Sequence, residues 1–386
     1  MIGNTDPEMQ IKYRNLFRNT LVRHLALQLN PVMISSNQSA DRKVFSSGKE
    51  YLFFSGTSYL GINNDKDFRA LVEQGMDAYG TNYSTSRKSN LQLKIFTEAE
   101  EKLARQAGSA AALTLSSGFM AGQLVIRALE HTGYFHYAPD THPAVWLSSD
   151  NFYHADFQAW SASISDKIRR SPAATHIILS NSVDPLTANA YSFEWINDQP
   201  KDKQIILVVD DSHGMGILNE GRGIYPAIPQ ADHVETIVVA SIGKAMGLPG
   251  GAIFGSRERI ARFSTSPWFS TSSPMSPAYL HAYMQADNVY RNAWLRLIDN
   301  IRQFTEDPIT GRMFSSIPGY PVFYCPHNEL YDFLLSRQIL ISSFAYPSPE
   351  DEPVTRIILN SHHTAEDIRE LLKALYAFES ATGISQ

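Results

Sequence analysis

The sequence is almost without cysteine, because Cys325 is the only one among its 386 residues. A single cysteine excludes an intramolecular disulfide and a zinc site built from several cysteines, and it fits a reducing compartment. We therefore expect a cytoplasmic protein in which Cys325 is a buried structural side chain.

Long hydrophobic runs and a strong charge of one sign are also missing. No stretch approaches the roughly 18 apolar residues that cross a bilayer, and the first residues do not have the pattern of a signal peptide. The formal net charge of −6 gives no reason to expect a nucleic acid or an anionic membrane as partner. With 43% hydrophobic and 19% charged residues, the chain has the composition of a globular protein with one large and one smaller domain.

Six short apolar runs, each ending in small polar residues, have the pattern of strands buried on both faces. They comprise residues 111–115, 144–147, 176–179, 205–209, 237–240 and 251–255. Segments long enough for a helix lie between most of them, for example 118–130 and 155–165. The alternation predicts an α/β fold with a mostly parallel central sheet flanked by helices.

The flanking segments predict further elements. Residues 93–107 form an amphipathic pattern closed by Gly108, and residues 277–304 have the pattern of one long helix. A small C-terminal α/β domain is expected from a strand, a helix, two strands and a helix at 320–324, 329–337, 339–344, 354–360 and 365–380, with a loop at 347–353. The expected division is an N-terminal arm at 1–50, a large domain at 51–285 and a small domain at 286–386.

Two predicted strands end in groups that carry chemistry. The run 205–209 leads into Asp210, Asp211 and His213, and the run 237–240 leads into Ser241 and Lys244. In open α/β sheets, ligands bind at the carboxyl ends of the strands. An acid, an imidazole and an amine at one edge suit a cofactor whose ring nitrogen is kept protonated and whose aldehyde reacts with the amine, which points to pyridoxal phosphate.

Each of these residues also has an alternative interpretation. Asp210 can cap a helix, or Asp210, Asp211 and His213 can bind a metal, although no further ligands at helical spacing accompany them. An isolated lysine is usually a solvated surface charge. Lys244, however, lies among small and apolar residues, which lower the pKa of an amine and prepare it as a Schiff-base nucleophile.

Further segments suit the remaining parts of the cofactor. Ser117, Gly118 and Phe119 lie where a strand turns into a helix, and the N–H groups of such a turn bind phosphate, although a serine there is often only a cap. Ser241 offers a hydroxyl near the lysine. His154 follows the second predicted strand and is expected to stack on the flat ring, although a lone histidine is usually structural.

Taken together, these motifs resemble those of the α-oxoamine synthases, from about residue 51 to residue 377. Enzymes of that family have the aspartate-aminotransferase-like fold (fold type I), use pyridoxal phosphate, and condense a small amino acid with an acyl-CoA thioester while releasing carbon dioxide. The matching motifs are Tyr59-Leu60-Gly61, Ser117-Gly118-Phe119, His154, Asp210-Asp211-Ser212-His213-Gly214-Met215-Gly216, Gly221-Arg222-Gly223, Ser241 with Lys244, Ser270-Thr271-Ser272, and Arg356 with Asp367-Ile368.

The resemblance implies a role for each position. Lys244, Asp210 and His154 would be the catalytic residues, with Asp210 pairing with the ring nitrogen and Lys244 binding the aldehyde and moving the α-proton. His213 would hydrogen-bond the phenolic oxygen of the ring. Arg356 would hold the carboxylate of the amino acid.

The resemblance also implies a homodimer. The segment Ser270, Thr271 and Ser272 would reach the cofactor of the neighbouring subunit, with Thr271 contacting its phosphate. Thr57 stands in the substrate site where the family usually has asparagine.

The departures from the family pattern concern the second substrate. Tyr83 replaces a glycine in the loop that lines the acyl-CoA entrance, Asn181 replaces an acidic residue, and Pro185 replaces a serine. Besides an α-oxoamine synthase-like condensation, the sequence therefore allows amino transfer or other α-carbon chemistry without CoA. A binding protein that has lost its chemistry is disfavoured, because Lys244 and Arg356 are both retained together with the acid and the histidine.

Overall fold

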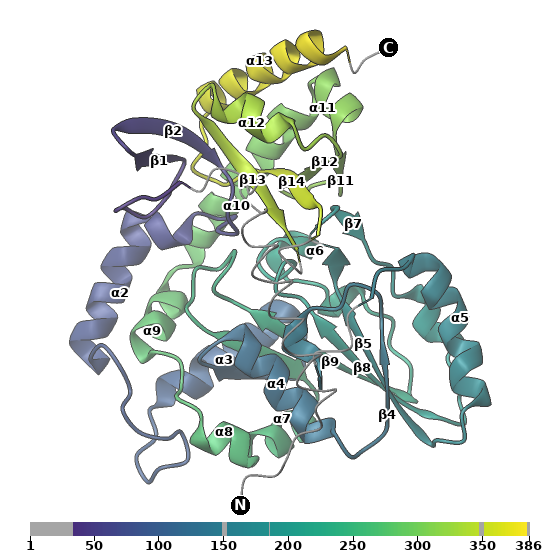
Figure 1. The fold of residues 1–386 in the computed structure, drawn as a ribbon. Helices are drawn as coiled ribbons and strands as arrows, with labels where there is room; N and C mark the ends of the chain where they lie inside the picture. The colour runs from purple at the N-terminus through teal and green to yellow at the C-terminus, as the bar shows by residue number, and fades with distance from the viewer. Residues whose placement is uncertain (1–33, 149–152, 185, 347–350, 384–386) are drawn as a thin grey trace, which may run out of the picture.

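The computed structural model describes residues 34–148, 153–184, 186–346 and 351–383. Two six-stranded sheets form its framework, one in the lower and one in the upper part of Figure 1. Along the described residues, no helix is both long enough and apolar enough to cross a bilayer.

The lower sheet is the predicted central sheet. Its strands follow the order β3 (Ala111–Leu115), β10 (Gly251–Gly255), β9 (Val234–Ser241), β8 (Gln204–Asp210), β5 (Thr175–Asn181) and β4 (Tyr134–Tyr137). The ladders β4–β5, β5–β8 and β8–β9 are parallel, whereas β10 is antiparallel to both of its neighbours. The predicted mostly parallel sheet is confirmed.

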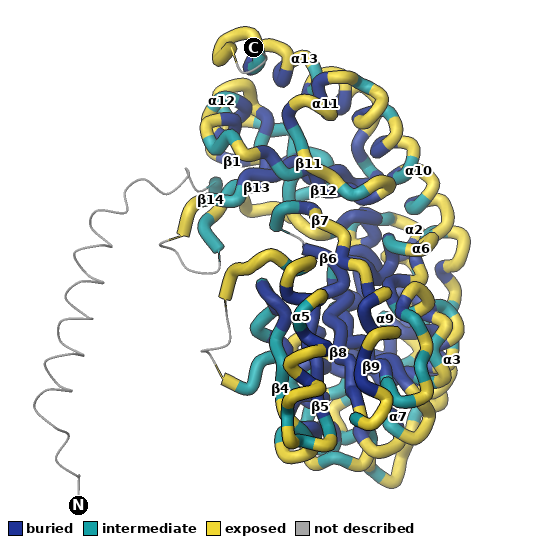
Figure 2. Tube along the Cα trace, turned by 90° about the vertical axis from the view of Figure 1, so that its right-hand side faces the viewer, coloured by how far each residue is buried: buried dark blue, intermediate teal, exposed yellow. Residues whose placement is uncertain are grey.

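Alternate residues of β8 explain why the strand sequences are apolar throughout. Ile206 and Val208 belong to one hydrophobic cluster, and Leu207 and Val209 belong to the other. Side chains of a strand alternate between the two faces of its sheet, so a sheet covered on both sides needs apolar residues at every position. In Figure 2 this sheet is accordingly the darkest, most buried part of the molecule.

Helices cover both faces of this sheet. They are α3 (Lys94–Ala107), α4 (Gly118–Leu129), α5 (Phe157–Arg170), α7 (Arg257–Ser264), α8 (Pro267–Thr271), α9 (Pro277–Gln285) and, packed against α9, α2 (Lys66–Tyr79). The predicted helix at 93–107 is confirmed as α3, which ends at Gly108 in a left-handed conformation with φ +74°.

One predicted strand is wrong. Residues 144–147 are not a strand: Pro143–Val145 is a 3-10 turn, η2, whose first residue is a proline. Proline cannot donate to a strand ladder, and η2 instead packs against α4, where a Cβ on Gly122 would lie 2.3 Å from the carbonyl oxygen of Ala144. The second strand of the sheet is β4, ten residues earlier in the chain.

The expected long helix at 277–304 consists of two helices. α9 ends at Gln285, and α10 (Asp287–Thr305) begins after Ala286, whose ψ of 20° leaves the helical range. Ala286 is fully buried, so the turn between the two helices is part of the core. From there α10 carries the chain to the upper sheet.

The upper sheet combines both ends of the chain. Its order is β1 (Lys43–Ser46), β2 (Lys49–Phe54), β13 (Ile339–Ala345), β14 (Pro353–Ile358), β12 (Val322–Cys325) and β11 (Ser315–Ser316). β2 pairs in parallel with β13, so residues of the expected N-terminal arm complete a sheet made mainly by C-terminal residues (Figure 1).

The elements expected between 320 and 380 are confirmed, with α12 (Leu330–Leu335) and α13 (Ala365–Thr382) as the two helices. Residues 347–350 of the expected loop lie outside the described residues, and β14 already begins at Pro353. The remaining short elements are η1 (Ile62–Asn64), β6 (Val183–Asp184), β7 (Asn189–Ala190), η4 (Glu194–Asp198), α6 (Leu218–Gly221), η5 (Tyr225–Ala227) and α11 (Pro308–Met313).

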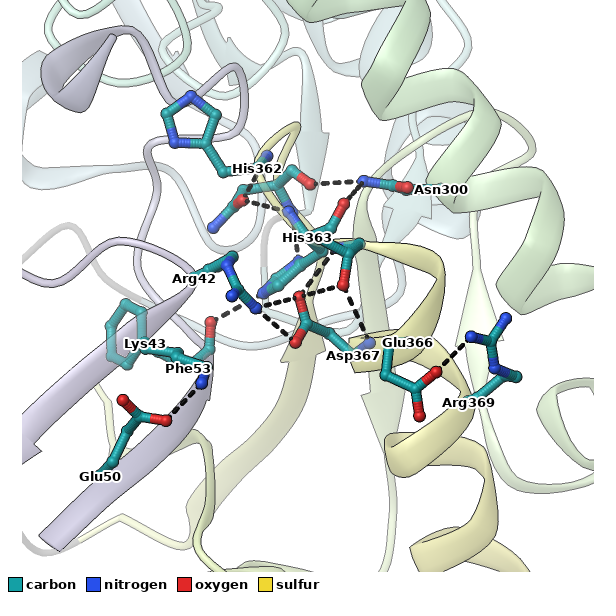
Figure 3. Close-up of polar contacts among 12 residues, drawn as sticks. Arg42, Lys43, Glu50, Phe53, Asn300, His362, His363, Glu366, Asp367 and Arg369 are labelled. Carbon is teal, nitrogen blue, oxygen red and sulfur yellow. Dashed lines mark hydrogen bonds and ion pairs between the residues drawn. The ribbon is translucent and has the colours of Figure 1, made fainter. Parts of the chain in front are cut away.

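Polar contacts fasten the N-terminal strands to the C-terminal segment (Figure 3). Arg42 donates two hydrogen bonds of 2.7 and 2.8 Å to Asp367 at the start of α13. Nε2 of His363 lies 3.0 Å from the carbonyl oxygen of Phe53, and the His363 ring stacks on Phe54. These contacts fix the position of β2, and with it the start of the segment that follows β2.

Candidate active site

A cavity of about 200 Å³ lies at the carboxyl ends of β5 and β8, facing β13 and β14 of the upper sheet. Among the residues predicted from the sequence, those that line it are Thr57, Asp210, His213, Lys244 and Arg356. Residues as far apart in the chain as Thr57 and Arg356 are thus brought to one site. Asp210 lies there at the carboxyl end of its strand, as the carboxyl-end rule predicts.

Lys244 is held by a short hydrogen-bonded chain. Its Nζ lies 2.7 Å from Nε2 of His213, and Nδ1 of His213 lies 2.8 Å from the hydroxyl of Tyr59. Burial lowers the pKa of Lys244 to about 8, with the nearby Arg356 acting in the same direction and Asp210 acting against it. Burial also holds the pKa of His213 well below its usual value, so the imidazole is neutral at physiological pH.

Asp210 is the last residue of β8 and is 6% exposed. Its Oδ1 accepts a hydrogen bond of 2.9 Å from the backbone N–H of Ser212. Its Oδ2 is 3.6 Å from Nδ1 of His142, which is longer than an ordinary hydrogen bond. A buried carboxylate with one oxygen still weakly paired fits the protonated ring nitrogen of pyridoxal phosphate.

Asp211 has a different role. It is 1% exposed, and its Oδ2 accepts from the backbone N–H of Ile224 at 2.8 Å. A Cβ on Gly214 or Gly223 would lie 2.0 or 2.2 Å from its carboxylate oxygens, so the loop after β8 wraps closely around this side chain. Among the described residues, no group of three or more His, Cys, Asp or Glu side chains is arranged to hold a metal ion. The metal alternative therefore has no support in the described part of the chain.

The predicted phosphate-binding residues lie at the N-terminus of α4, beside the end of β9. Ser117 caps the helix by accepting from the backbone N–H of Met120 at 3.1 Å. A Cβ on Gly118 would lie 2.6 Å from Cα of Ser241, and Ser241 donates its N–H to Oγ of Ser212, which lines the cavity. The N-terminus of α4 is thus linked to the cavity wall through Ser241 and Ser212, and its free N–H groups and positive dipole end suit a phosphate group. Phe119, in the first turn of α4, is 58% exposed.

The structure places His154 outside this cavity. Its Nδ1 lies 2.5 Å from Oδ1 of Asp140, its side chain is 62% exposed, and it lines a second cavity of about 830 Å³ together with Tyr191 and Trp195. Residues 149–152, which lead to it, lie outside the described residues. The His154 ring therefore does not lie at the site where it was expected to stack on the cofactor.

His142 lines the active-site cavity instead. Its backbone N–H donates to Oδ1 of Asn181 at 3.0 Å, and its ring faces Asp210. The sequence analysis did not predict His142, because the second strand was expected at 144–147. The first histidine after that expected strand is His154, which was therefore assigned to the ring. The available signal was the sequence Thr141-His142-Pro143, a turn-forming run after the aromatic strand β4.

Asn181 explains one departure from the family pattern. At the end of β5 it accepts from the N–H of His142 and donates its side-chain amide to the carbonyl oxygen of Asp140 at 2.7 Å. An amide both accepts and donates in this way, whereas an ionised acid only accepts. Asn181 therefore holds the turn that carries His142. Pro185, the other departure near this strand, lies outside the described residues.

Arg356 forms the opposite wall of the cavity from β14 and is 7% exposed. Its guanidinium lies 5.3 Å from the ring of Phe344, and burial lowers the pKa of Arg356 from its usual value. A buried guanidinium suits a carboxylate ligand, because the two groups form paired hydrogen bonds. Much of the remaining lining is apolar and consists of Val183, Leu186, Phe344, Tyr346 and Ile358. The sequence did not predict these residues, because they belong to segments that share no motif.

The predicted residues Ser117, Gly118, Phe119 and Ser241 do not line the cavity, and neither do two other predicted regions of this chain. Thr271, at the end of α8, donates its hydroxyl to the carbonyl oxygen of Pro267 at 2.8 Å and is exposed. Tyr83 packs against Phe96, with ring centroids 5.6 Å apart, and donates to the carbonyl oxygen of Leu91. The expected contact of Thr271 with a neighbouring subunit stays a prediction.

The fold and this cavity define a pyridoxal-phosphate-dependent transferase of fold type I. Residues 54–375 match the family model described as aminotransferase class I and II, and the chain belongs to that family.

Its relatives include 8-amino-7-oxononanoate synthases. That of Aeromonas salmonicida is 28% identical over 353 residues, covering 85% of this chain and 86% of that protein. That of Hahella chejuensis is 27% identical over 365 residues, covering 89% and 91%. Among solved structures, a lysine-to-alanine variant of serine palmitoyltransferase from S. paucimobilis, with a bound aldimine of pyridoxal phosphate and myriocin, has a TM-score of 0.77 at 17% identity, covering 98% of this chain and all of that one. The predicted α-oxoamine synthase resemblance, fold type and cofactor are confirmed.

Proposed function

We propose that the protein condenses a small amino acid with an acyl-CoA thioester, with loss of carbon dioxide. The observation that carries this proposal is the shared cavity of Lys244 and Arg356, an amine of lowered pKa facing a buried guanidinium. One group suits proton transfer at an α-carbon and the other suits its carboxylate. The similarity to 8-amino-7-oxononanoate synthases supports acyl transfer as the reaction class.

The cofactor would be held by residues of four segments. Asp210 would keep the ring nitrogen protonated, the N-terminus of α4 with Ser117 and Gly118 would bind the phosphate, and Ser241 would support that end. His142, rather than His154, is the histidine whose position suits a contact with the ring. Pyridoxal phosphate, when bound, supplies an electron sink for the electrons of the α-carbon.

The residues of this chain then select and deprotonate the substrate. Arg356 would bind the carboxylate of the amino acid and orient its α-carbon toward Nζ of Lys244, which would take the α-proton as a neutral amine. Thr57 would contribute a hydroxyl on the same wall. The apolar lining by Val183 and Ile358 suits a small, uncharged side chain.

We further propose a cytoplasmic homodimer. Its support is the exposure of Thr271, whose segment resembles the one that reaches the neighbouring cofactor in the α-oxoamine synthases, and the absence of this segment from the cavity of its own chain. Mass measurement in solution at micromolar concentration should give twice the 43.2 kDa of one chain.

Product analysis tests the reaction. Purified protein loaded with pyridoxal phosphate is incubated with single amino acids and a series of acyl-CoA thioesters, and free CoA and carbon dioxide are measured. We expect both products in equal amounts with at least one pair, and neither with Lys244→Ala. Release of CoA without carbon dioxide, or turnover that persists in Lys244→Ala, would contradict the proposal.

Amino transfer is the second candidate, favoured by the match to the aminotransferase class I and II family. The same protein is therefore incubated with an amino acid and a 2-oxo acid in the absence of CoA. Formation of the new amino acid without any acyl-CoA requirement would favour this function over the condensation.

A further inference from the structure

Tyr59 is a buried tyrosine that ends a chain of three side chains in the active site. It is 1% exposed, and its hydroxyl lies 2.8 Å from Nδ1 of His213. The other ring nitrogen, Nε2, lies 2.7 Å from Nζ of Lys244. The three residues come from three separate segments of the sequence, and one pair of polar atoms joins each to the next.

The direction of the first hydrogen bond follows from the chemistry of the two groups. Burial raises the pKa of Tyr59 to about 12, so its hydroxyl keeps its proton and is able to donate. His213 is neutral, and a neutral imidazole has one N–H and one acceptor nitrogen. When Tyr59 donates to Nδ1, the ring proton must be on Nε2.

The second hydrogen bond then has only one possible direction. An Nε2–H group donates, so Nζ of Lys244 must accept, and only an uncharged amine has the lone pair to do so. We propose that Tyr59 is a positioning residue that fixes His213 as the Nε2–H tautomer and thereby stabilises the neutral form of the Lys244 amine.

The charged groups around Lys244 make such a device useful. Asp210 faces the amine and favours its charged form, while Arg356 and the burial of the site oppose it. His213 itself faces Lys244, Arg356 and His142. A donor N–H directed at Nζ counteracts the carboxylate at the one atom that has to be uncharged in order to take a proton.

Tyr59 is held in place from the C-terminal end of the chain. The backbone N–H of Ser361 donates to the carbonyl oxygen of Tyr59 at 3.0 Å, and its hydroxyl donates to that of Leu60 at 2.7 Å. Gly61 has a positive φ of +64°, and a Cβ there would lie 2.8 Å from Nε2 of His362. Figure 3 shows His362 within the network that fastens the two ends of the chain. The backbone that carries the Tyr59 ring is therefore held by tertiary contacts at Tyr59 and at the two residues that follow it.

Tyr320 provides a matched control. It is fully buried, its ring centroid lies 6.0 Å from that of Tyr59, and its hydroxyl donates to the backbone carbonyl oxygen of His213 at 3.2 Å. Removing this hydroxyl also removes its interaction with the Tyr59 hydroxyl, but it leaves Nδ1 of His213 and its donor in place. Tyr59→Phe and Tyr320→Phe thus remove the same atom from neighbouring buried rings, and only the first removes the tautomer constraint.

The tautomer is measured directly by ¹⁵N NMR of the full-length protein with ring-labelled histidine, without cofactor and loaded with it. His213 is assigned from the signal lost in His213→Gln. We expect the Nε2–H pattern in the unsubstituted protein and in Tyr320→Phe, and a mixed or Nδ1–H pattern in Tyr59→Phe. An Nδ1–H or doubly protonated ring in the unsubstituted protein at pH 9, above the pKa of about 8 of Lys244, would overturn the proposal, whatever the variants do.

The second readout is the ionisation of Lys244. Acylation of this residue by an amine-reactive ester is followed by peptide mass spectrometry in cofactor-free protein across pH 6 to 11. The pH of half-maximal rate is expected to rise by about one unit in Tyr59→Phe, since one hydrogen bond that favours the neutral amine is lost, and to stay unchanged in Tyr320→Phe. An equal shift in both variants, or in neither, contradicts the proposal.

The role of this tautomer in the loaded protein rests on the proposed function, because His213 is there expected to donate to the ring oxygen of the cofactor. The two NMR and labelling experiments need no turnover. A protein with the Nε2–H tautomer but without condensation or amino transfer would refute the proposed function and leave this inference standing.

Discussion

At the scale of single residues, the active site depends on side chains that burial has moved away from their usual protonation states. Burial shifts the pKa of both Lys244 and Asp211 toward the neutral form. Lys244 lines the cavity, whereas Asp211 does not. Their neighbours differ, since Lys244 faces polar side chains that line the cavity and Asp211 is enclosed by a glycine-rich loop. Burial therefore prepares Lys244 for reaction, whereas in Asp211 it belongs to the packing of the loop after β8.

His142 and His154 give the first prediction. We expect His142→Ala to weaken the binding of pyridoxal phosphate by up to about tenfold, because a ring contact of this kind contributes about 0.5 to 1.5 kcal/mol. His142→Phe should recover most of the affinity by keeping a flat ring. Titration of cofactor-free protein, followed by its visible absorbance, measures both.

His154→Ala is the matched control, since the structure places this histidine in the second cavity. It should leave the affinity for pyridoxal phosphate within about twofold of the unsubstituted value. If His154→Ala weakens binding and His142→Ala does not, the sequence-based assignment is right and the structural one is wrong.

Asp211 gives the second prediction. Burial raises its pKa from the usual 3.8 to about 7, against the opposing effect of hydrogen bonds that include one from the N–H of Ile224. The folded state thus favours the protonated carboxyl, and this contribution to stability is complete below about pH 4 and is lost as the pH rises through 7. In Asp211→Asn, which is neutral at every pH, the loss should disappear.

Urea unfolding of cofactor-free protein at pH 5 and pH 8 measures this difference. Relative to Asp211→Asn, the unsubstituted protein should lose about 1 to 4 kcal/mol of stability between the two values. Parallel pH profiles for the two proteins would show that Asp211 is ionised throughout.

At the scale of elements, the sequence predicts strands well where a continuous apolar run coincides with a buried ladder. β3 and β10 have the predicted bounds, and β8 and β9 extend them only by one to three residues at each end. The failures have local causes. Pro143 converts an apolar run into a turn. β4 is a short aromatic strand without an aliphatic run, and among the described residues it has a ladder partner on one side only.

The contact between α4 and β9 gives the third prediction. Gly118→Ala would place a Cβ 2.6 Å from Cα and Cβ of Ser241, so the start of α4 must move away from the end of β9. We expect a loss of about 1 to 3 kcal/mol in stability and at least a tenfold loss in affinity for pyridoxal phosphate. Inorganic phosphate, as a weak competitor, should lose its effect on cofactor binding in the same variant.

Gly311 in α11 is the control for this substitution. Nothing lies within 4 Å of a Cβ at this position, and no positive φ restricts it, so Gly311→Ala should stabilise the protein by up to about 1 kcal/mol. Unchanged cofactor affinity in Gly118→Ala would show that the α4 terminus does not bind the phosphate.

At the scale of the whole molecule, the cavity exists because two sheets meet. The central sheet contributes Asp210 and the lysine, whereas Arg356 comes from β14 of the upper sheet. The upper sheet in turn needs β1 and β2 from the beginning of the chain. The position of the guanidinium relative to the amine is therefore a property of the complete fold and not of either sheet.

The pair of Arg42 and Asp367 gives the fourth prediction. Asp367 is 4% exposed, and hydrogen bonds from Thr364 and Arg42 outweigh its burial and lower its pKa, so this contribution to stability is present above pH 3.8 and lost as the pH falls through the lowered value. Arg42→Ala should cost about 1 to 3 kcal/mol at pH 7, because a buried carboxylate loses its two charge-assisted hydrogen bonds.

Arg69→Ala removes an exposed pair with Glu73 on α2 and should change stability by less than about 0.5 kcal/mol. Chemical unfolding with far-ultraviolet circular dichroism compares the two variants. Equal small effects would mean that the network in Figure 3 does not fasten the two ends of the chain.

The sequence by itself determined the α/β class, the cofactor and the residues that follow β8 and β9, because continuous apolar runs specify buried strands and the carboxyl ends of parallel strands meet at one edge. Lys244, Asp210 and His213 were found in this way. Arg356 and Thr57 came from the resemblance, and the cavity indeed includes both.

Only the tertiary structure decided which histidine lines the cavity, which aromatic residues complete it, and how Tyr59 reaches His213. These depend on a proline that ends an apolar run, on contacts between residues some 300 positions apart such as Leu60 and Ser361, and on the meeting of two sheets. Local periodicity determines which elements form, whereas long-range packing determines which side chains share a cavity, and no pattern of neighbouring residues contains that information.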